Sequence, residues 1–207
     1  MRLPLILAGV AAAVATPVVA LQQPPATIPS AADASRVTAG TYKADAAHTL
    51  IGWRVDHMGF NDYFGIFGDA AGTLTIDPAR PAQARLEMTI PVAKVTTASE
   101  GLTKHLLSKD FFNTAVNSEA KFVSTAVTVS GTTAKVAGNL TLNGVTKPVT
   151  LDTQFVGAGA NPMSKAATIG FHAKATIRRS DFGIAYGIPV VSDAVELDIT
   201  AAFEKAA

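Results

Sequence analysis

The sequence predicts an all-β protein, an eight-stranded antiparallel barrel with one short α-helix. Segments that alternate polar and apolar residues recur along the chain at the spacing of short strands. These segments are joined by turn residues, and helical crossovers are almost absent. Such connections are typical of antiparallel sheets. We favour a barrel over a sandwich because closure removes edge strands, and because eight strands leave room for side chains or one small ligand.

The N-terminal part of the chain, up to Thr38, is expected to lie outside the barrel. Residues 1–20 start with a positive charge at Arg2, continue as an Ala-rich apolar run and end in small residues at Ala20, as a secretory signal peptide does. An uncleaved N-terminal anchor is the alternative for this segment. Residues 21–38 contain three prolines among Ala, Gln and Ser, which indicates a linker. The barrel domain is therefore expected at residues 39–207.

Composition narrows the class of protein further. The chain has 17 basic and 16 acidic residues, so it lacks the excess positive charge of a nucleic-acid-binding protein. After residue 20 no segment is long and apolar enough to predict a stable membrane span. There is no cysteine, so the domain must be stabilised by its core alone. Export without disulfides favours the bacterial periplasm as the location.

The strands are expected in the following order. Residues 48–58 form the first, with Ile51, Trp53, Val55 and His57 on one face. The others are expected at residues 71–77, 85–91 and 121–130, in a hairpin at 135–151 that continues to 156, and at 167–177 and 194–203.

One helix is expected between the third and fourth strands. Thr97 and Glu100 match a capping box, in which Thr97 accepts a backbone hydrogen bond and Glu100 reaches back. Leucines from Leu102 to Leu107 supply the apolar stripe of this helix. It is expected to end near residues 110–112.

The hairpin at 135–151 carries the clearest local signal. Asn143 and Gly144 suit the two left-handed positions of a type I′ turn. This turn predicts four cross-strand pairs on one apolar face: Leu142 with Val145, Leu140 with Lys147, Gly138 with Val149 and Val136 with Leu151. Small inward residues such as Gly138 and Ala173 indicate a cavity. The alternative is that larger side chains opposite them fill the space.

Motifs for catalysis are weak. The chain has no cysteine, no G-x-S-x-G and no glycine-rich phosphate loop, and its four histidines lack metal-binding spacing. We therefore assign no catalytic residue and no metal. A hydrolase or isomerase that uses His57 or His172 is kept as an alternative, although we favour the interpretation of His57 as a hydrogen-bonded core or rim histidine.

Polar residues are expected at one end of the barrel. Continuing the alternation from Ile177 places Arg179 and Asp181 on the apolar side, beside Phe182. The hairpin register places Lys147 on the same side, where a long side chain can reach water. These residues either fix the end of the barrel or recognise the polar head of a ligand.

Several short motifs follow one another in a fixed order over about residues 41–203. They are Tyr42 and Asp45 before His48, Gly65–Phe67, Gly72 with Asp77, His105–Phe112, Lys121–Phe122, Gly138–Leu151, Gly170–Phe171, Arg179–Gly183 and Val191–Asp193. In these motifs the chain resembles the YceI-like family. Trp53 is a departure, since the family more often has a smaller aromatic residue there.

The resemblance implies a lipocalin-like barrel that holds a long isoprenoid chain, of polyprenyl or quinone type, without catalysis and without another cofactor. A structural or stress-protective envelope protein without a small ligand is the alternative, and a homodimer is left open. The expected lumen residues are Ile51, Trp53, Val55, Phe67, Met88, Phe122, Leu140, Leu142, Phe171 and Phe182. The expected polar mouth residues are His57, Lys147, Arg179 and Asp181.

Overall fold

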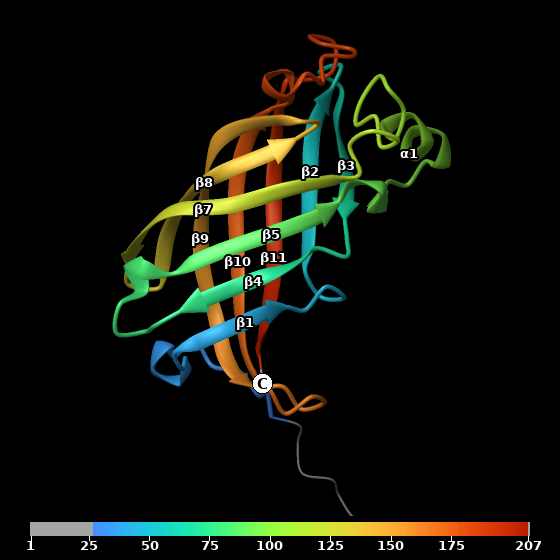
Figure 1. Cartoon of the computed structure of the whole chain (residues 1–207). Coiled ribbons are helices and arrows are strands. Elements are labelled where there is room, and N and C mark those ends of the chain that lie inside the picture. Colours follow the sequence, from blue (N-terminus) through green and yellow to red (C-terminus); the bar gives the residue numbers. More distant parts are fainter. Residues whose placement is uncertain (1–26, 207) are drawn as a thin grey trace, which may run out of the picture.

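A computed structural model describes residues 27–206, and these form one antiparallel sheet that curls into a barrel (Figure 1). The strands are β1 (Gly40–Ala44), β2 (Leu50–His57), β3 (Asn61–Phe67), β4 (Ala71–Ile76), β5 (Arg85–Pro91), β6 (Val95–Thr96), β7 (Glu119–Ser130), β8 (Thr133–Leu142), β9 (Val145–Ala160), β10 (Ala167–Arg178) and β11 (Ala194–Lys205). The helical elements are α1 (Glu100–Leu106) and the 3-10 turns η1 (Ala34–Arg36), η2 (Pro81–Gln83), η3 (Val92–Lys94) and η4 (Arg179–Phe182).

Eight strands form the closed ring, in the order β1-β4-β5-β7-β8-β9-β10-β11, and β1 pairs back onto β11. This confirms the predicted eight-stranded antiparallel barrel, and α1 is the one α-helix of the described residues. The first half of β11 pairs instead with β2, through Glu196 with Arg54 to Thr200 with Leu50. Strands β2, β3 and β6 therefore extend the wall beyond the ring, to the top of the view in Figure 1.

The predicted hairpin register is confirmed. Strands β8 and β9 make all four expected pairs, from Leu142 with Val145 to Val136 with Leu151. Asn143 and Gly144 have φ values of 51° and 76°, as a type I′ turn requires. Turn chemistry and alternation agree here within one short stretch of chain, so no distant contact was needed to specify the register.

The predicted helix exists, but its cap is different. Ser99, not Thr97, is the N-cap, and its hydroxyl accepts a hydrogen bond from Leu102 N at 3.3 Å. The Thr97 hydroxyl instead lies 2.9 Å from that of Thr103 and donates to Ser99 O at 2.8 Å. Because Thr97 is used to fix the loop before the helix, the helix begins later than predicted. It also ends at Leu106, before residues 110–112.

Part of the segment interpreted as a linker packs against the barrel. Ala31 forms an antiparallel bridge with Ala158, and Val37, only 9% exposed, joins a buried cluster. Gly157 permits this approach, since a Cβ atom there would lie 3.1 Å from Ala31 O. The packed chain thus begins before residue 39. The predicted signal peptide, residues 1–20, lies outside the described residues.

The buried apolar side chains gather in two clusters rather than one. One includes Tyr42, Ile169 and Phe203, near the β1–β11 closure, and the other includes Val92 and Phe182, near η3 and η4. Within residues 27–206, no helix is long and apolar enough to cross a membrane.

Candidate functional site

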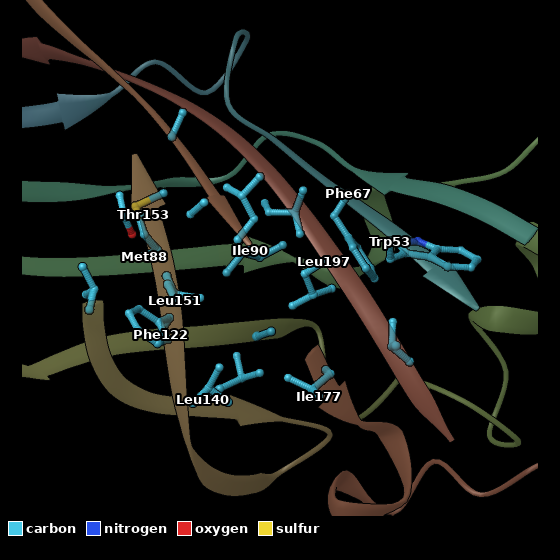
Figure 2. Close-up of a pocket in the computed structure, with 18 of the residues that line it drawn as sticks. Trp53, Phe67, Met88, Ile90, Phe122, Leu140, Leu151, Thr153, Ile177 and Leu197 are labelled. Carbon is cyan, nitrogen blue, oxygen red and sulfur yellow. The ribbon is translucent and has the colours of Figure 1, made fainter. Parts of the chain in front are cut away.

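A cavity of about 940 Å³ occupies the interior of the barrel. This volume lies near the upper end of the range of about 300–1,000 Å³ for small-molecule sites. Figure 2 shows Ile90, Phe122, Leu140 and Leu197 directed into this shared space from four different strands. The walls are mainly aliphatic and aromatic, so the interior favours an apolar guest over water.

Nine of the ten predicted lumen residues line this cavity, namely Ile51, Trp53, Val55, Phe67, Met88, Phe122, Leu140, Leu142 and Phe171. Phe182 is the exception and corrects the prediction. It is 1% exposed and lies behind the cavity wall, where it packs with Val92, Ala120 and Ile184, which line the cavity themselves. It was expected in the lumen because it lies beside Arg179 and Asp181, but β10 ends at Arg178 and Phe182 belongs to η4.

The four predicted mouth residues divide into two pairs. His57 and Arg179 line the cavity, whereas Lys147 and Asp181 do not. Asp181 is exposed because η4 replaces the strand after Arg178 and turns this side chain away from the interior. Lys147 pairs with Leu140 as expected, yet its side chain is exposed to solvent.

Arg179 fixes the chain that follows it. Its Nε donates to Ser192 O at 2.8 Å, its Nη1 to Ile184 O at 3.2 Å and Tyr186 O at 2.7 Å, and its Nη2 to Val191 O at 2.8 Å. The side chain is 6% exposed, and this burial lowers the pKa of its guanidinium below the ordinary value. The guanidinium thus donates hydrogen bonds to four backbone carbonyls, and Arg179 thereby orders the loop of residues 183–193 at the end of the barrel.

Three large lumen side chains lie flat over glycines of neighbouring strands. At each of these glycines, an added Cβ atom would collide with the side chain concerned; at Gly138 it would lie 2.7 Å from Cε2 of Phe122. The expectation that Gly138 leaves open space is therefore wrong locally, because the Phe122 ring occupies it. The glycines allow these side chains to lie against the wall, which leaves the centre of the lumen open. The pairs are Trp53 over Gly65, Met88 over Gly72 and Phe122 over Gly138.

The cavity reaches the surface at both ends of the barrel. At the end that carries the β2–β3 turn and residues 183–193, called the β2–β3 end, it is lined by the exposed side chains of Met58, Tyr186 and Val190. At the opposite end, called the β4–β5 end, the exposed lining residues include Pro78 and Gly131.

Sequence reasoning did not identify an aromatic cluster at the β2–β3 end. The His105 ring lies 5.0 Å from the rings of Phe111 and Tyr186, centroid to centroid, and its Nε2 lies 3.1 Å from Asp110 Oδ2. His105 and Phe111 belong to the segment after β6, and Tyr186 to the loop that Arg179 holds. The cluster therefore joins these two segments beside the mouth. His105 and Phe111 fall in a motif of the family resemblance, which was the available signal.

The histidines proposed for catalysis have different positions. His57 lines the cavity, with its ring 6.5 Å from that of Tyr63, whereas His172 is exposed on β10. Neither ring is hydrogen-bonded to a carboxylate within residues 27–206. In the same part of the chain no group of three or more His, Asp or Glu residues is arranged to hold a metal ion.

A closed antiparallel barrel around a large apolar lumen defines the lipocalin-like class of proteins. The family model described as the YceI-like domain matches residues 42–203. A UPF0312 protein of Serratia proteamaculans is 40% identical over 169 residues, which cover 81% of this chain and 88% of that protein. The chain therefore belongs to the YceI-like family, as its motifs indicated.

Two solved structures share the fold. Burkholderia cenocepacia BcnA is 26% identical with a TM-score of 0.69, and the match covers 77% of this chain and 98% of BcnA. A polyisoprenoid binding domain from Saccharophagus degradans, described as implicated in plant cell wall breakdown, has a TM-score of 0.61 and 19% identity, with 80% and 98% covered. At this identity the second likeness concerns the fold alone.

Proposed function

We propose that this protein is a lipid-binding protein that holds a long isoprenoid chain, of polyprenyl or quinone type, in the barrel lumen without catalysing a reaction on it. The observation that carries the proposal is the cavity of about 940 Å³ with its aliphatic and aromatic walls. Membership of the YceI-like family supports it, as does the fold shared with a domain described as polyisoprenoid-binding.

Burial of an apolar chain is sufficient for binding. A tail that removes about 600 Å² of apolar surface from water gains about 15 kcal/mol before costs. Loss of translational and rotational freedom costs about 4–15 kcal/mol, and ordering the tail costs more. Binding therefore needs a dry lumen and few polar contacts. Since one methylene changes affinity by only about 1–3 kcal/mol, such a lumen discriminates weakly between neighbouring chain lengths.

The proposed location is the periplasm, with residues 1–20 as an export signal. The support is the sequence of this segment, a positive charge followed by an Ala-rich apolar run. Fractionation of the source bacterium tests the location, and recovery of the protein from the cytoplasm would contradict it.

Native mass spectrometry of protein purified without detergent tests lipid binding. Wild-type protein is expected to carry a mass adduct that organic solvent extracts and that fragments as an isoprenoid. Leu140→Glu places a charge in the lumen and is expected to abolish the adduct. Asn139→Glu adds the same charge to the adjacent exposed position on β8 and serves as the matched control.

Both variants must first show cooperative unfolding. A wild-type lumen that stays empty, and that takes up no polyprenol or quinone in solution, would contradict the proposal. It would favour a structural or stress-protective envelope protein.

A further inference from the structure

Large apolar side chains are exposed around the mouth at the β2–β3 end. Phe60 in the β2–β3 turn is 87% exposed and Met58 beside it 50%, while Tyr186 and Val190 in the loop of residues 183–193 are each 55% exposed. These four residues, called the apolar rim, lie on two loops that Figure 1 places together at the top of the barrel. Exposed apolar side chains gathered in this way mark an interaction site more often than scattered ones do.

The two loops of the apolar rim are held together by backbone hydrogen bonds. Met58 N donates to Val190 O at 2.9 Å, and Ser192 N donates to Asp56 O at 3.0 Å. Arg179 fixes the second loop from beneath through its four carbonyl contacts. The apolar rim is therefore a preformed surface, and contact with a partner would require little ordering.

The apolar rim is continuous with the lumen. Met58, Tyr186 and Val190 are exposed to solvent and also line the cavity, so an apolar chain leaving the lumen here would remain in contact with apolar side chains. The β4–β5 end differs. Its exposed lining residues include Gly131, Thr132 and Thr133, with Pro78 and the 39% exposed Val129, so large apolar side chains are fewer and less exposed there.

The charges beside the apolar rim are mixed: Asp56, Glu100 and Asp110 are acidic, and Lys104 and Lys109, which can contact anionic headgroups, are basic. The carboxylate of Asp56 accepts a hydrogen bond from Gly59 N at 2.9 Å, and that of Asp110 lies 3.1 Å from His105 Nε2. Lys104 and Lys109, on the segment that His105 joins to the rim, are exposed and form no ion pair among the described residues. Exposed lysines near an anionic lipid surface each contribute about a five-fold gain in affinity.

We propose that the apolar rim docks on the surface of an anionic lipid bilayer, so that the lumen mouth opens directly onto the lipid from which the protein takes its ligand. The uptake of a ligand through the mouth rests on the proposed function. Aromatic and aliphatic side chains at loop tips enter the interfacial layer of a bilayer, where Tyr is favoured. An isoprenoid tail can then pass between bilayer and lumen without crossing water, which would otherwise oppose its release.

Co-sedimentation with vesicles tests the docking. The mature protein purified after export is mixed with vesicles of phosphatidylcholine and phosphatidylglycerol in a two-to-one ratio. Phe60→Ser is expected to weaken binding about ten-fold, because a nearly fully exposed aromatic side chain is lost without loss of internal packing. Met163→Ser is the matched control, since Met163 is 88% exposed at the far end of the barrel, in the β9–β10 turn.

A second variant tests the charge contribution. Lys104→Gln combined with Lys109→Gln is expected to weaken binding at least ten-fold on vesicles with phosphatidylglycerol and to leave binding to phosphatidylcholine alone unchanged. Wild-type protein that stays in solution, or a Phe60→Ser variant that binds as the wild type does, would overturn the docking proposal. Such a result would favour a protein partner for the apolar rim.

Native mass spectrometry of the same samples separates the two proposals. The Phe60→Ser variant is expected to retain its lumen lipid after purification while losing vesicle binding, since Phe60 does not line the cavity. Vesicle binding by a protein with an empty lumen that takes up no isoprenoid would support docking and contradict the proposed function. A lipid-loaded wild type that does not bind vesicles would support the proposed function and contradict the docking proposal.

Discussion

A comparison of two phenylalanine truncations measures whether the lumen is open in solution. Phe171 lines the cavity, is half-buried and contacts Phe155 and Phe203 edge-on, with centroids 6.0 and 6.2 Å away. Phe182, 1% exposed, is packed on all sides. Truncation of a fully packed Phe costs about 3–5 kcal/mol. For Phe171→Ala we expect about 2 kcal/mol, because the face toward the cavity loses no protein contacts.

Urea unfolding of delipidated protein provides the assay, since bound lipid would add its own stabilisation. The transition midpoint should fall much further for Phe182→Ala than for Phe171→Ala, with similar slopes. Isoprenoid affinity should show the opposite order, with about a ten-fold loss for Phe171→Ala and little change for Phe182→Ala. Equal losses in unfolding free energy for the two variants, together with unchanged isoprenoid affinity of Phe171→Ala, would refute the reasoning. They would mean that the barrel wall has collapsed onto Phe171 and that no open lumen exists in solution.

Two further predictions concern the loop beside the mouth. Arg179→Met removes four hydrogen bonds and leaves the carbonyl of the buried Ile184 without a partner, so we expect a loss of about 3–7 kcal/mol in unfolding free energy, measured by urea titration. Asp193 accepts hydrogen bonds from Ser180 N and Ser180 Oγ, both at 2.8 Å, and the first of these chiefly lowers its pKa. A lowered carboxyl pKa stabilises the fold above the unfolded value of about 3.9, so the stability difference between wild type and Asp193→Asn should be constant above about pH 5 and shrink below about pH 4.

The parts of the fold that short-range rules determine were predictable from sequence. The β8–β9 register follows from one turn and one alternation, and the face of β2 that carries Ile51, Trp53 and Val55 follows from period two alone. Closure of the sheet into a barrel was predicted from the number of strands, since a closed ring has no edge strands. The extension of the wall by β2 and β3 was not, because it depends on β11 pairing with two different strands along its length.

Errors arose where contacts distant in sequence replaced the local pattern. The alternation of β10 ends at Arg178 because the next residues turn into η4, which is held by hydrogen bonds from Ser180 to Asp193, further along the chain. Asp181, which the alternation had placed inward, is therefore exposed, and Phe182 beside it is buried behind the cavity wall. Similarly, the composition of residues 21–38 indicated a linker, but the bridge from Ala31 to Ala158 joins segments far apart in the sequence and leaves no signal in composition.

The glycines beneath Trp53, Met88 and Phe122 separate two dimensions of the barrel that are usually treated together. The number and tilt of the strands determine the diameter of the backbone cylinder. The bore left inside depends on whether each large side chain lies along the wall or stands out from it, and Gly65, Gly72 and Gly138 decide this. A methyl group added at Gly65 would meet only atoms of Trp53 and would raise that ring into the passage, whereas at Gly72 and Gly138 it would also meet the backbone carbonyls of Glu87 and Val123. Relatives with the same strands can therefore differ in calibre, and in the guests they admit, through single substitutions on the wall.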